Sequence, residues 1–566
     1  MATRSSAKIR ANALMATAVS LVLASCQPAR FQPRAIDYDM ILPGGSGSLD
    51  RRYRAGGKLG DGDGSGTEAS SANPREGVDG EIARASQEID ESPAYSEKLK
   101  LAAVVDSVTS RFPLYLAKLL ERDIASGRVE EAMGQFDTKL AGKLGGQLDG
   151  FYESTVGQAG LEQPLATGDT IYGGYRISDG FLPDYYKDRT QDDGRLFFGG
   201  RFPLLRNRGM DGRRRDVRVA QIDAALAEPE IDAARIGYVQ KASQSYHKWT
   251  ATGRKLQIAR QLLDLAEARQ AGLQRGVDRQ FLAPLVLTDN TRLIAKRRIY
   301  VIKAERDFQV AALQLSLFLR DEHDDPIVVS EANLPEAVVA VAPPTADAAG
   351  TEAEQAAAAE EAAASAAEAE RMLARSLTED VALAVRQRPD LVALQLEIER
   401  IEADRDLAEN QMLPNLDLIV DVATPLNSAP YKDREDIELF VGGELKLPLQ
   451  RRKARGKLRQ ATAKLTKLQF KQRFQKDRIT NEILDARSAI QAAGNQLLNA
   501  RINVENSAAM VRFEQRKFDL GRSDLLRVQI QEAKLADAQI DEVNAQLGMR
   551  LAAVNYRAAM GFDTPQ

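Results

Sequence analysis

The 566-residue sequence contains one cysteine, one tryptophan and two histidines. A single cysteine excludes an internal disulfide framework and a cysteine-rich metal site. His247 and His323 are too isolated to form a histidine-based metal centre, and the sequence shows no nucleophile–base pattern or phosphate-binding motif. Because no apolar run is long enough for a transmembrane helix, any membrane crossing must use strands. We therefore expect that the protein is not an enzyme and that it holds neither a metal ion nor a cofactor.

The N-terminal residues have the organisation of an export signal. Basic residues at positions 4, 8 and 10 precede a short apolar stretch from Ala11 to Ala24. This stretch runs into Leu23–Cys26, which resembles the lipobox of bacterial lipoproteins, where the cysteine becomes the acylated first residue of the mature chain. We predict a signal peptide over residues 1–25 and acylation of Cys26, for example with palmitate. The Gln27 that follows favours sorting to the outer membrane; an ordinary secretory signal is the alternative.

Two segments have the composition of linkers. Residues 26–98 follow the signal and are rich in Gly, Ser and Asp, so they cannot bury enough apolar surface to fold alone. Residues 344–375 are dominated by Ala and Glu and have no apolar stripe that could dock on a core. We interpret the first segment as a flexible tether and the second as a solvated insertion.

A coiled-coil seam is the strongest helical signal. Six large apolar residues recur at every seventh position, and alanines follow three of them at the d spacing. The large residues are Ile483, Ile490, Leu497, Val504, Val511 and Phe518. No proline lies between Pro448 and Pro565. We therefore predict one helix from near Arg452 to Leu520, roughly 100 Å long at about 1.5 Å per residue.

The second half of the chain repeats the first. Tyr186–Arg189 recurs 245 residues later as Tyr431–Arg434, and Pro203–Leu204 recurs as Pro448–Leu449 at the same spacing. We predict two structural repeats, over residues 99–343 and 376–562. Each is expected to contain a helix, a strand, a polar loop, a strand, a very long helix, a tight turn and a shorter helix. The opening helical segment is predicted from about Leu99 to Lys143 in the first repeat and from about Leu377 to Met412 in the second. The first long helix should kink or restart at Pro229.

Two strand hairpins, with four strands in total, follow from this pattern. Alternation is clear over 195–204, 415–423 and 437–447, and residues 147–156 are a further candidate. Strands of about ten residues can cross an outer membrane at a tilt, but four are too few to close a barrel, so the chain must oligomerise. The polar loops at the far ends of the hairpins contain Tyr186, Lys187, Asp188, Arg189, Tyr431, Lys432, Asp433 and Arg434.

The turns at the ends of the long helices have a common chemistry. Gly276 and Gly521 suit the left-handed position that ends a helix. Asp278 and Ser523, two residues later in each case, suit the N-cap of the helix that follows. We predict two tight helical hairpins with exposed tips.

Several motifs resemble those of the TolC-like outer-membrane efflux proteins. They are Arg388–Leu391, Leu413–Leu418, Pro448–Leu449 before a basic helix, and Phe518–Leu526. The resemblance implies a homotrimer that is mainly α-helical. Its long antiparallel helices would form a hollow α-barrel across the periplasm, and its strands a shared twelve-stranded β-barrel in the outer membrane.

The same resemblance implies a passive exit duct for efflux or type I secretion. Its periplasmic tips would dock on an adaptor protein of an inner-membrane transporter. The tip residues are Gly276, Val277, Asp278, Leu520, Gly521, Arg522, Ser523 and Asp524.

Other features of the sequence leave alternatives open. Many relatives carry an acidic constriction ring after the second tip, but Arg527, Gln529 and Gln531 occupy the comparable positions, with Asp524 and Glu532 nearby. We therefore assign no carboxylate gate. Basic residues near the start of the second long helix favour contact with lipid head groups, since an exported chain rarely meets nucleic acid. The alternative functions are a periplasmic coiled-coil adaptor or a structural envelope lipoprotein without a channel, and the sequence does not identify the cargo.

Overall fold

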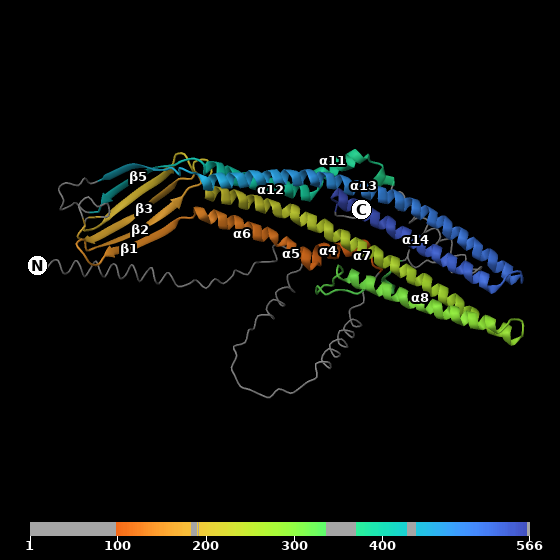
Figure 1. The fold of residues 1–566 in the computed structure, drawn as a ribbon. Coiled ribbons are helices and arrows are strands. Elements are labelled where there is room, and N and C mark those ends of the chain that lie inside the picture. Colours follow the sequence, from red (N-terminus) through yellow and green to blue (C-terminus); the bar gives the residue numbers. More distant parts are fainter. Residues whose placement is uncertain (1–97, 183–188, 191, 336–369, 427–436, 563–566) are drawn as a thin grey trace, which may run out of the picture. The chain divides into compact units, whose positions relative to one another are not determined.

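The computed structural model describes residues 98–182, 189–190, 192–335, 370–426 and 437–562 (Figure 1). All of them belong to one compact unit, Arg84–Gln566. The predicted signal peptide, Cys26 and the tether up to residue 97 lie outside the described residues. So do most of the Ala/Glu-rich insertion and seven of the eight hairpin-loop residues. The eighth, Arg189, donates a hydrogen bond from Nη1 to the carbonyl oxygen of Leu182 at 3.1 Å.

Three short helices open the described chain, where the sequence predicted one long helical segment from Leu99 to Lys143. The break after the first comes at Phe112, because Pro113 restricts the preceding residue and starts the next helix. The elements are α4 (Leu101–Arg111), α5 (Pro113–Leu119), α6 (Glu121–Met133) and the 3₁₀ turn η2 (Gly134–Phe136). The first strand then begins at Lys139, so the helical prediction is wrong for the end of the segment.

Six strands form one antiparallel sheet in sequence order, so the prediction of four strands per chain is wrong. Of the predicted strand at residues 147–156, residues 148–153 are in fact the turn between the first two strands, and only its ends belong to strands. The strands are β1 (Lys139–Gln147), β2 (Ser154–Pro164), β3 (Thr170–Gly180), β4 (Arg195–Pro203), β5 (Asn415–Pro425) and β6 (Glu438–Lys446). The predicted strands in the regions of β4, β5 and β6 are confirmed.

Glycine explains why the extra strands were missed. Gly is depleted in strands, and β1 and β3 each contain three glycines. Here glycine lets neighbouring backbones approach closely: a Cβ on Gly146 would lie 2.3 Å from the carbonyl oxygen of Ser154. A Cβ on Gly174 would lie equally close to the carbonyl oxygen of Ala159. Strand pairing, which is not visible in local sequence, therefore overrides local propensity.

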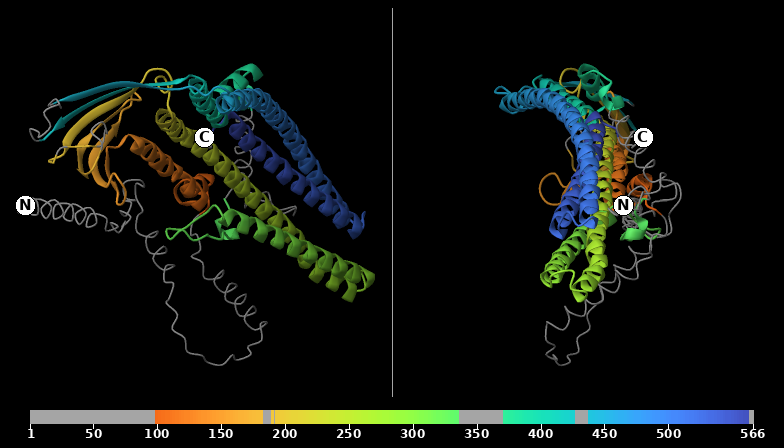
Figure 2. Two further views of the ribbon diagram at one scale, coloured as in Figure 1. Left: turned by 60° about the vertical axis from the view of Figure 1, so that its left-hand side comes forward. Right: turned by 90° about the vertical axis from the view of Figure 1, so that its right-hand side faces the viewer.

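Two long helical hairpins follow the strands. The first contains α7 (Gly212–Asp278) and α8 (Leu285–Ser316), and the second contains α13 (Arg452–Asp519) and α14 (Leu525–Met560). The second long helix has almost the predicted bounds. The first continues through Pro229 without a restart. Figures 1 and 2 show that both hairpins turn at the same end of the helices, away from the sheet.

The remaining elements are short. They are the 3₁₀ turn η3 (Glu331–Asn333), α11 (Leu377–Gln387) and α12 (Pro389–Asn410). The last two replace the single predicted helix of residues 377–412, because the chain breaks where Pro389 follows Arg388. None of the helices described combines the length and the apolar character that a bilayer crossing requires.

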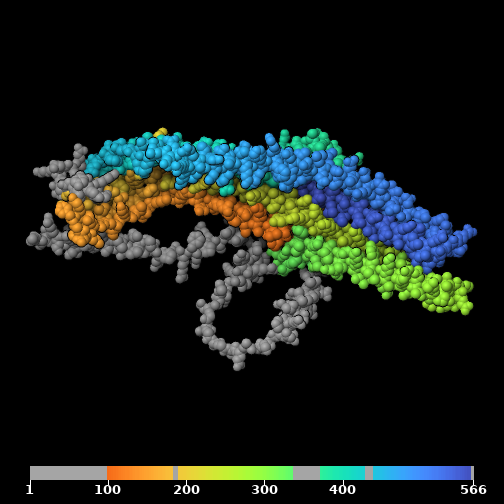
Figure 3. Space-filling view, viewed as in Figure 1, coloured from red at the N-terminus to blue at the C-terminus, as the bar shows by residue number. Residues whose placement is uncertain are grey.

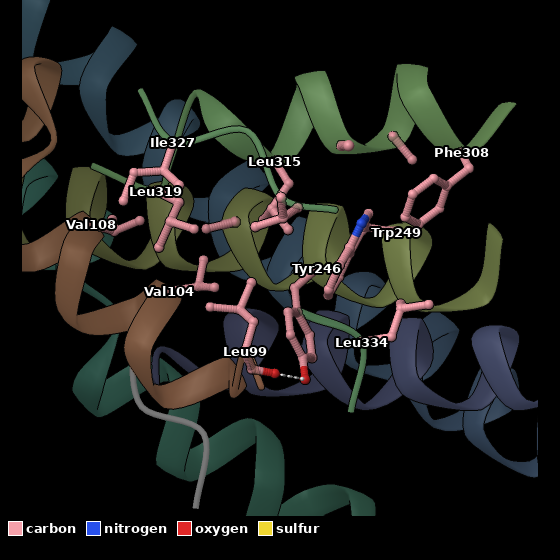
Figure 4. Close-up of a cluster of buried hydrophobic side chains, with 14 of the residues drawn as sticks. Leu99, Val104, Val108, Tyr246, Trp249, Phe308, Leu315, Leu319, Ile327 and Leu334 are labelled. Atoms are coloured by element: carbon pink, nitrogen blue, oxygen red, sulfur yellow. Dashed lines mark hydrogen bonds between the residues drawn. The ribbon is translucent and has the colours of Figure 1, made fainter. Parts of the chain in front are cut away.

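The seam predicted on the second long helix is buried at four of its six large residues, while Val504 and Phe518 are partly exposed. Ile483 and Ile490 are at most 1% exposed and pack with Ala486, Ala493 and α14 residues in one hydrophobic cluster. A second cluster surrounds Trp249, which is fully buried beside Phe308 and Leu334 (Figure 4). There the hydroxyl of Tyr246 donates to the carbonyl oxygen of Leu99 at 3.0 Å, which ties the N-terminal helices to α7. The core therefore consists of separate clusters along the helices.

Candidate functional site

The tip of the second hairpin is built as predicted around Gly521. Its φ of 69° is left-handed, which glycine adopts without a steric penalty. The amide of Gly521 donates to the carbonyl of Phe518 at 2.9 Å, and the amide of Arg522 donates to the carbonyl of Lys517 at 2.8 Å. These two bonds form a Schellman motif, which satisfies carbonyl groups at the end of α13.

The tip of the first hairpin has the same motif, but its left-handed residue is Gln280, with a φ of 61°. The amide of Gln280 donates to the carbonyl of Val277 at 2.8 Å, and that of Phe281 donates to the carbonyl of Gly276 at 2.9 Å. The prediction that Gly276 is the left-handed residue is therefore wrong. Gly276 lies in the last turn of α7, where a Cβ would come within 2.7 Å of Leu282 Cδ1. Its small size allows Leu282 to pack across the turn.

Both predicted N-caps are also wrong, although the error is small at the second tip. Asp278 is the last residue of α7, and α8 starts only at Leu285 without a side-chain cap. At the second tip Asp524, and not Ser523, caps α14 by accepting from the amide of Arg527 at 3.0 Å. A carboxylate at this end of a helix also interacts favourably with the helix dipole.

Ser523 has another role at the second tip. Its hydroxyl donates to Glu514, a buried carboxylate that lies one helical turn before Phe518 on α13. The amine of Lys517 lies 3.9 Å from the same carboxylate. The turn is thus held by side chains as well as by its backbone.

Exposed apolar side chains surround both turns, and of these only Leu520 was among the predicted tip residues. Leu520 and Leu526 are 68% and 55% exposed at the second tip. Phe281 and Leu285 are 81% and 75% exposed at the first. Large apolar side chains at exposed turns are a recognisable signal, and together they mark a candidate contact surface.

A buried charged cluster joins the two hairpins behind their tips. Glu532 of α14 is 3% exposed and lies between Arg269 of α7 and Arg297 of α8. Its Oε2 lies 3.3 Å from Nη2 of Arg297, and its other oxygen accepts from Arg269. Burial lowers the pKa of the Arg297 guanidinium, and Glu532 opposes this effect by raising it. Nearby, the buried Nε2 of Gln529 finds no hydrogen-bond partner among the described residues.

The two acidic residues that the sequence placed near a possible constriction have different partners. Glu532 is engaged by two arginines, and Asp524 is a helix cap. Within the described chain, both carboxylates therefore have partners. The same described residues contain no group of three side chains that could hold a metal ion.

The sheet presents two chemically different faces. On one face Arg195 pairs with Glu438 at 3.1 Å, and Arg201 lies 3.5 Å from Glu444 and 3.8 Å from Asp417. The opposite face is apolar and exposed; it includes Leu140, Leu161, Phe198, Val422 and Leu439. A sheet that leaves its apolar face uncovered needs an apolar environment on that side.

Comparisons with known proteins agree with this geometry. A family model described as outer membrane efflux protein matches residues 380–562. The fold is similar to that of the outer-membrane channel OprN, with a TM-score of 0.54 and 13% identity over 84% of this chain and 95% of that one.

Two further channels are similar to the same extent. CusC gives a TM-score of 0.55 at 13% identity over 83% of this chain and 94% of its own. VceC of Vibrio cholerae gives a TM-score of 0.54 at 14% identity over 82% of this chain and 96% of its own. No curated protein sequence matches. The resemblance to TolC-like channels that the sequence indicated is confirmed.

Proposed function

From the family match over residues 380–562 and the fold of outer-membrane channels, we propose that this protein is the exit duct of a tripartite efflux or type I secretion system. One observation carries the proposal. A two-faced sheet is connected within a few residues to helices of 67 and 68 residues, once from β4 to α7 and once from β6 to α13. The chain thus combines a sheet suited to line a membrane pore with long helices that extend far from that sheet. Figure 3 shows α13 and α14 following this path on the visible face.

The strands have the dimensions of an outer-membrane wall. They contain nine or eleven residues each, and the length needed for a tilted crossing is about 9–11 residues. The apolar face would contact lipid, and the face with Arg195 and Arg201 would line water. At about 1.5 Å per residue the long helices extend roughly 100 Å beyond it.

Uncovered apolar stripes on the helices favour assembly into a homotrimer. On α8, Leu285, Ile299 and Leu313 lie two heptads apart and are 75%, 69% and 44% exposed. On α13, Phe470, Leu484 and Leu498 have the same spacing and are 67%, 43% and 60% exposed. A single chain leaves both stripes facing water, whereas packing between copies covers them. Three copies would form a hollow helical barrel.

Internal duplication is part of this proposal. Strands β3 and β5 both have 11 residues, β4 and β6 both have nine, and the two long helices differ by one residue. Apart from β1 and β2, which have no counterpart in the second half, the strands and long helices follow in the same order, and both tips end in a Schellman motif. These correspondences support two repeats over 99–343 and 376–562. The acylated Cys26 would add an anchor in the outer membrane and leave the rod in the periplasm.

The tips are proposed to dock on a periplasmic adaptor that connects the duct to an inner-membrane transporter. The residues expected to take part are Gly276–Asp278 and Leu520–Asp524, together with exposed Phe281 and Leu526. Transport is then passive, because energy is supplied by the transporter. A coiled-coil adaptor or a structural lipoprotein without a channel would not need a sheet with an exposed apolar face, so the structure favours the duct.

The first experiment is to extract the protein from outer membranes with detergent and to measure its mass. We expect a trimer that still requires detergent when Cys26→Ser removes the acylation site. A soluble monomer after this substitution would refute the duct.

The second experiment tests docking. A photo-crosslinking amino acid at Leu520 should give a covalent adduct with a periplasmic protein in intact envelopes. The matched control is Leu114 on α5, which is 59% exposed against 68% for Leu520. Equal adducts from both positions would contradict docking at the tip.

A further inference from the structure

We propose that the strands of three chains close one barrel of eighteen strands, in which the hairpin β1–β2 of each chain is an added section of wall. This inference rests on the proposed function and concerns its membrane part. The sequence predicted twelve strands because it counted four per chain, but the sheet contains six. Two arrangements are possible for a trimer: all six strands enter the wall, or β1 and β2 stay outside it.

The pairing register shows that β1 and β2 belong to the same continuous sheet as the other strands. β1 pairs with β2 over all nine of its residues, from Lys139 opposite Glu162 to Gln147 opposite Ser154. β2 pairs with β3 over all 11. The first hairpin is therefore a continuous part of the sheet and not a separate flap.

The chemical character of each face also continues across the hairpin. One transverse row runs through all six strands by successive pairing and is apolar throughout. It consists of Leu140, Leu161, Gly173, Phe198, Val422 and Leu439. The next row has Lys139 opposite Glu162 on β1 and β2, and Tyr172 hydrogen-bonded to Asp421 further along. The added hairpin thus has the same lipid side and the same water side as the rest.

Only the outer strands can pair with another copy. In the described sheet β1 and β6 each have one paired side, whereas β3 is paired with both β2 and β4. A barrel built from β3 to β6 alone would need β3 to pair with β6 of the next chain. The 11 residue pairs between β2 and β3 would have to separate first. Pairing of β1 with β6 of a second copy breaks nothing and covers both open edges, which proteins seldom leave exposed.

The added strands widen the pore. Barrel diameter grows about linearly with strand number, so eighteen strands make a barrel about one and a half times as wide as twelve. With strands about 4.8 Å apart and tilted by about 40°, the backbone diameter changes from ~24 Å to ~36 Å. Barrels of this strand number leave an aqueous channel. The membrane section then admits macromolecular cargo, and selection by size passes to the helical part.

Cysteine pairs on the apolar face distinguish the two arrangements in the full-length protein. The first series combines Leu144→Cys on β1 with a cysteine at Leu439, Val441 or Leu445 on β6, which samples the unknown register between copies. The matched series replaces Leu144 by Ile177 on β3. We expect oxidation to give covalent trimers with at least one pair of the first series and with none of the second.

The outcomes separate this inference from the proposed function. Covalent trimers from the Ile177 series, or a trimer in which the Leu144 series never cross-links, overturn the eighteen-stranded barrel and leave the duct intact. A monomeric mass with no cross-link in either series overturns both. Electron microscopy of the unmodified trimer gives an independent measurement, because a barrel near 24 Å in diameter contradicts the inference whatever the variants do.

Discussion

The buried carboxylate of Glu532 makes a quantitative prediction about the link between the two hairpins. The side chains of Glu532, Arg297 and Arg269 are 2%, 5% and 17% exposed. Glu532→Gln keeps the shape of the side chain but leaves two largely buried guanidinium groups without their carboxylate. Breaking a buried ion pair in this way costs about 3–5 kcal/mol. We expect the loss to appear where α8 and α14 are held together.

Hydrogen exchange of backbone amides in the native trimer measures this effect locally. A loss of about 3–5 kcal/mol should speed exchange in α8 and α14 near the cluster by roughly 10²–10³-fold or more, since each 1.4 kcal/mol is about tenfold. The matched control is Glu267→Gln, which removes a carboxylate from an exposed pair with Arg298; the two side chains are 40% and 63% exposed. We expect the control to lower the free energy of local opening by no more than about 1 kcal/mol, because water screens exposed pairs.

A triple variant separates charge from packing. Replacing Arg269, Arg297 and Glu532 together by methionine removes all three charges and keeps side chains of similar length. Such replacements are often neutral or stabilising, so exchange should return toward the wild-type rate. If Glu532→Gln exchanges no faster than the Glu267 control, the cluster does not join the hairpins and the reasoning is refuted.

Substitutions in three other regions should change local or global stability in a direction that the structure predicts. Only glycine adopts the left-handed conformation freely, so Gly521→Ala should weaken amide protection against exchange at the second tip by about 1 kcal/mol. For the same reason Gln280→Gly should strengthen protection at the first tip by a similar amount. If both variants changed protection in the same direction, this reasoning would be contradicted. Burial and two nearby arginines lower the pKa of His247 to about 4, so the unfolded chain binds the proton more tightly and stability should be lost as the pH falls from about 6.5 to 4. Melting temperatures of the wild type and His247→Gln should diverge over this range, and parallel curves would exclude His247 as the cause. Asp380 is fully buried and accepts from Arg487 and from the hydroxyl of Tyr556, so Asp380→Asn should destabilise the packing of α11 by about 3 kcal/mol. Limited proteolysis should then cleave α11 first, and unchanged resistance would argue against this role.

The features that the sequence predicted well depend on local or periodic signals. The seven-residue repeat from Ile483 located α13, because the residues of a seam must return to the same face of the helix. Gly521 located the second tip, because few other residues adopt its conformation without strain. The alternating residues of β4, β5 and β6 located those strands.

The features that the sequence missed depend on contacts between distant residues. At the first tip Gln280 takes the left-handed conformation that glycine usually occupies, while Gly276 is small because Leu282 packs against it. Strands β1 and β3 each contain three glycines, and β1 has no β-branched or aromatic residue, so their pairing with β2 and β4 could not be read from local propensity. The sequence placed Glu532 near a possible constriction, but its arginine partners come from the distant helices α7 and α8.

The single tryptophan gives the protein a built-in optical reporter. Trp249 is the only indole in 566 residues, and it is fully buried in the cluster that also contains Leu99 and Leu334. Its fluorescence therefore comes from one place, midway between the sheet and the tips along α7. Emission would shift to longer wavelength if this cluster admitted water, but would stay unchanged if only the tips or the strands moved. Opening of the duct and loss of its middle packing can thus be distinguished without a label.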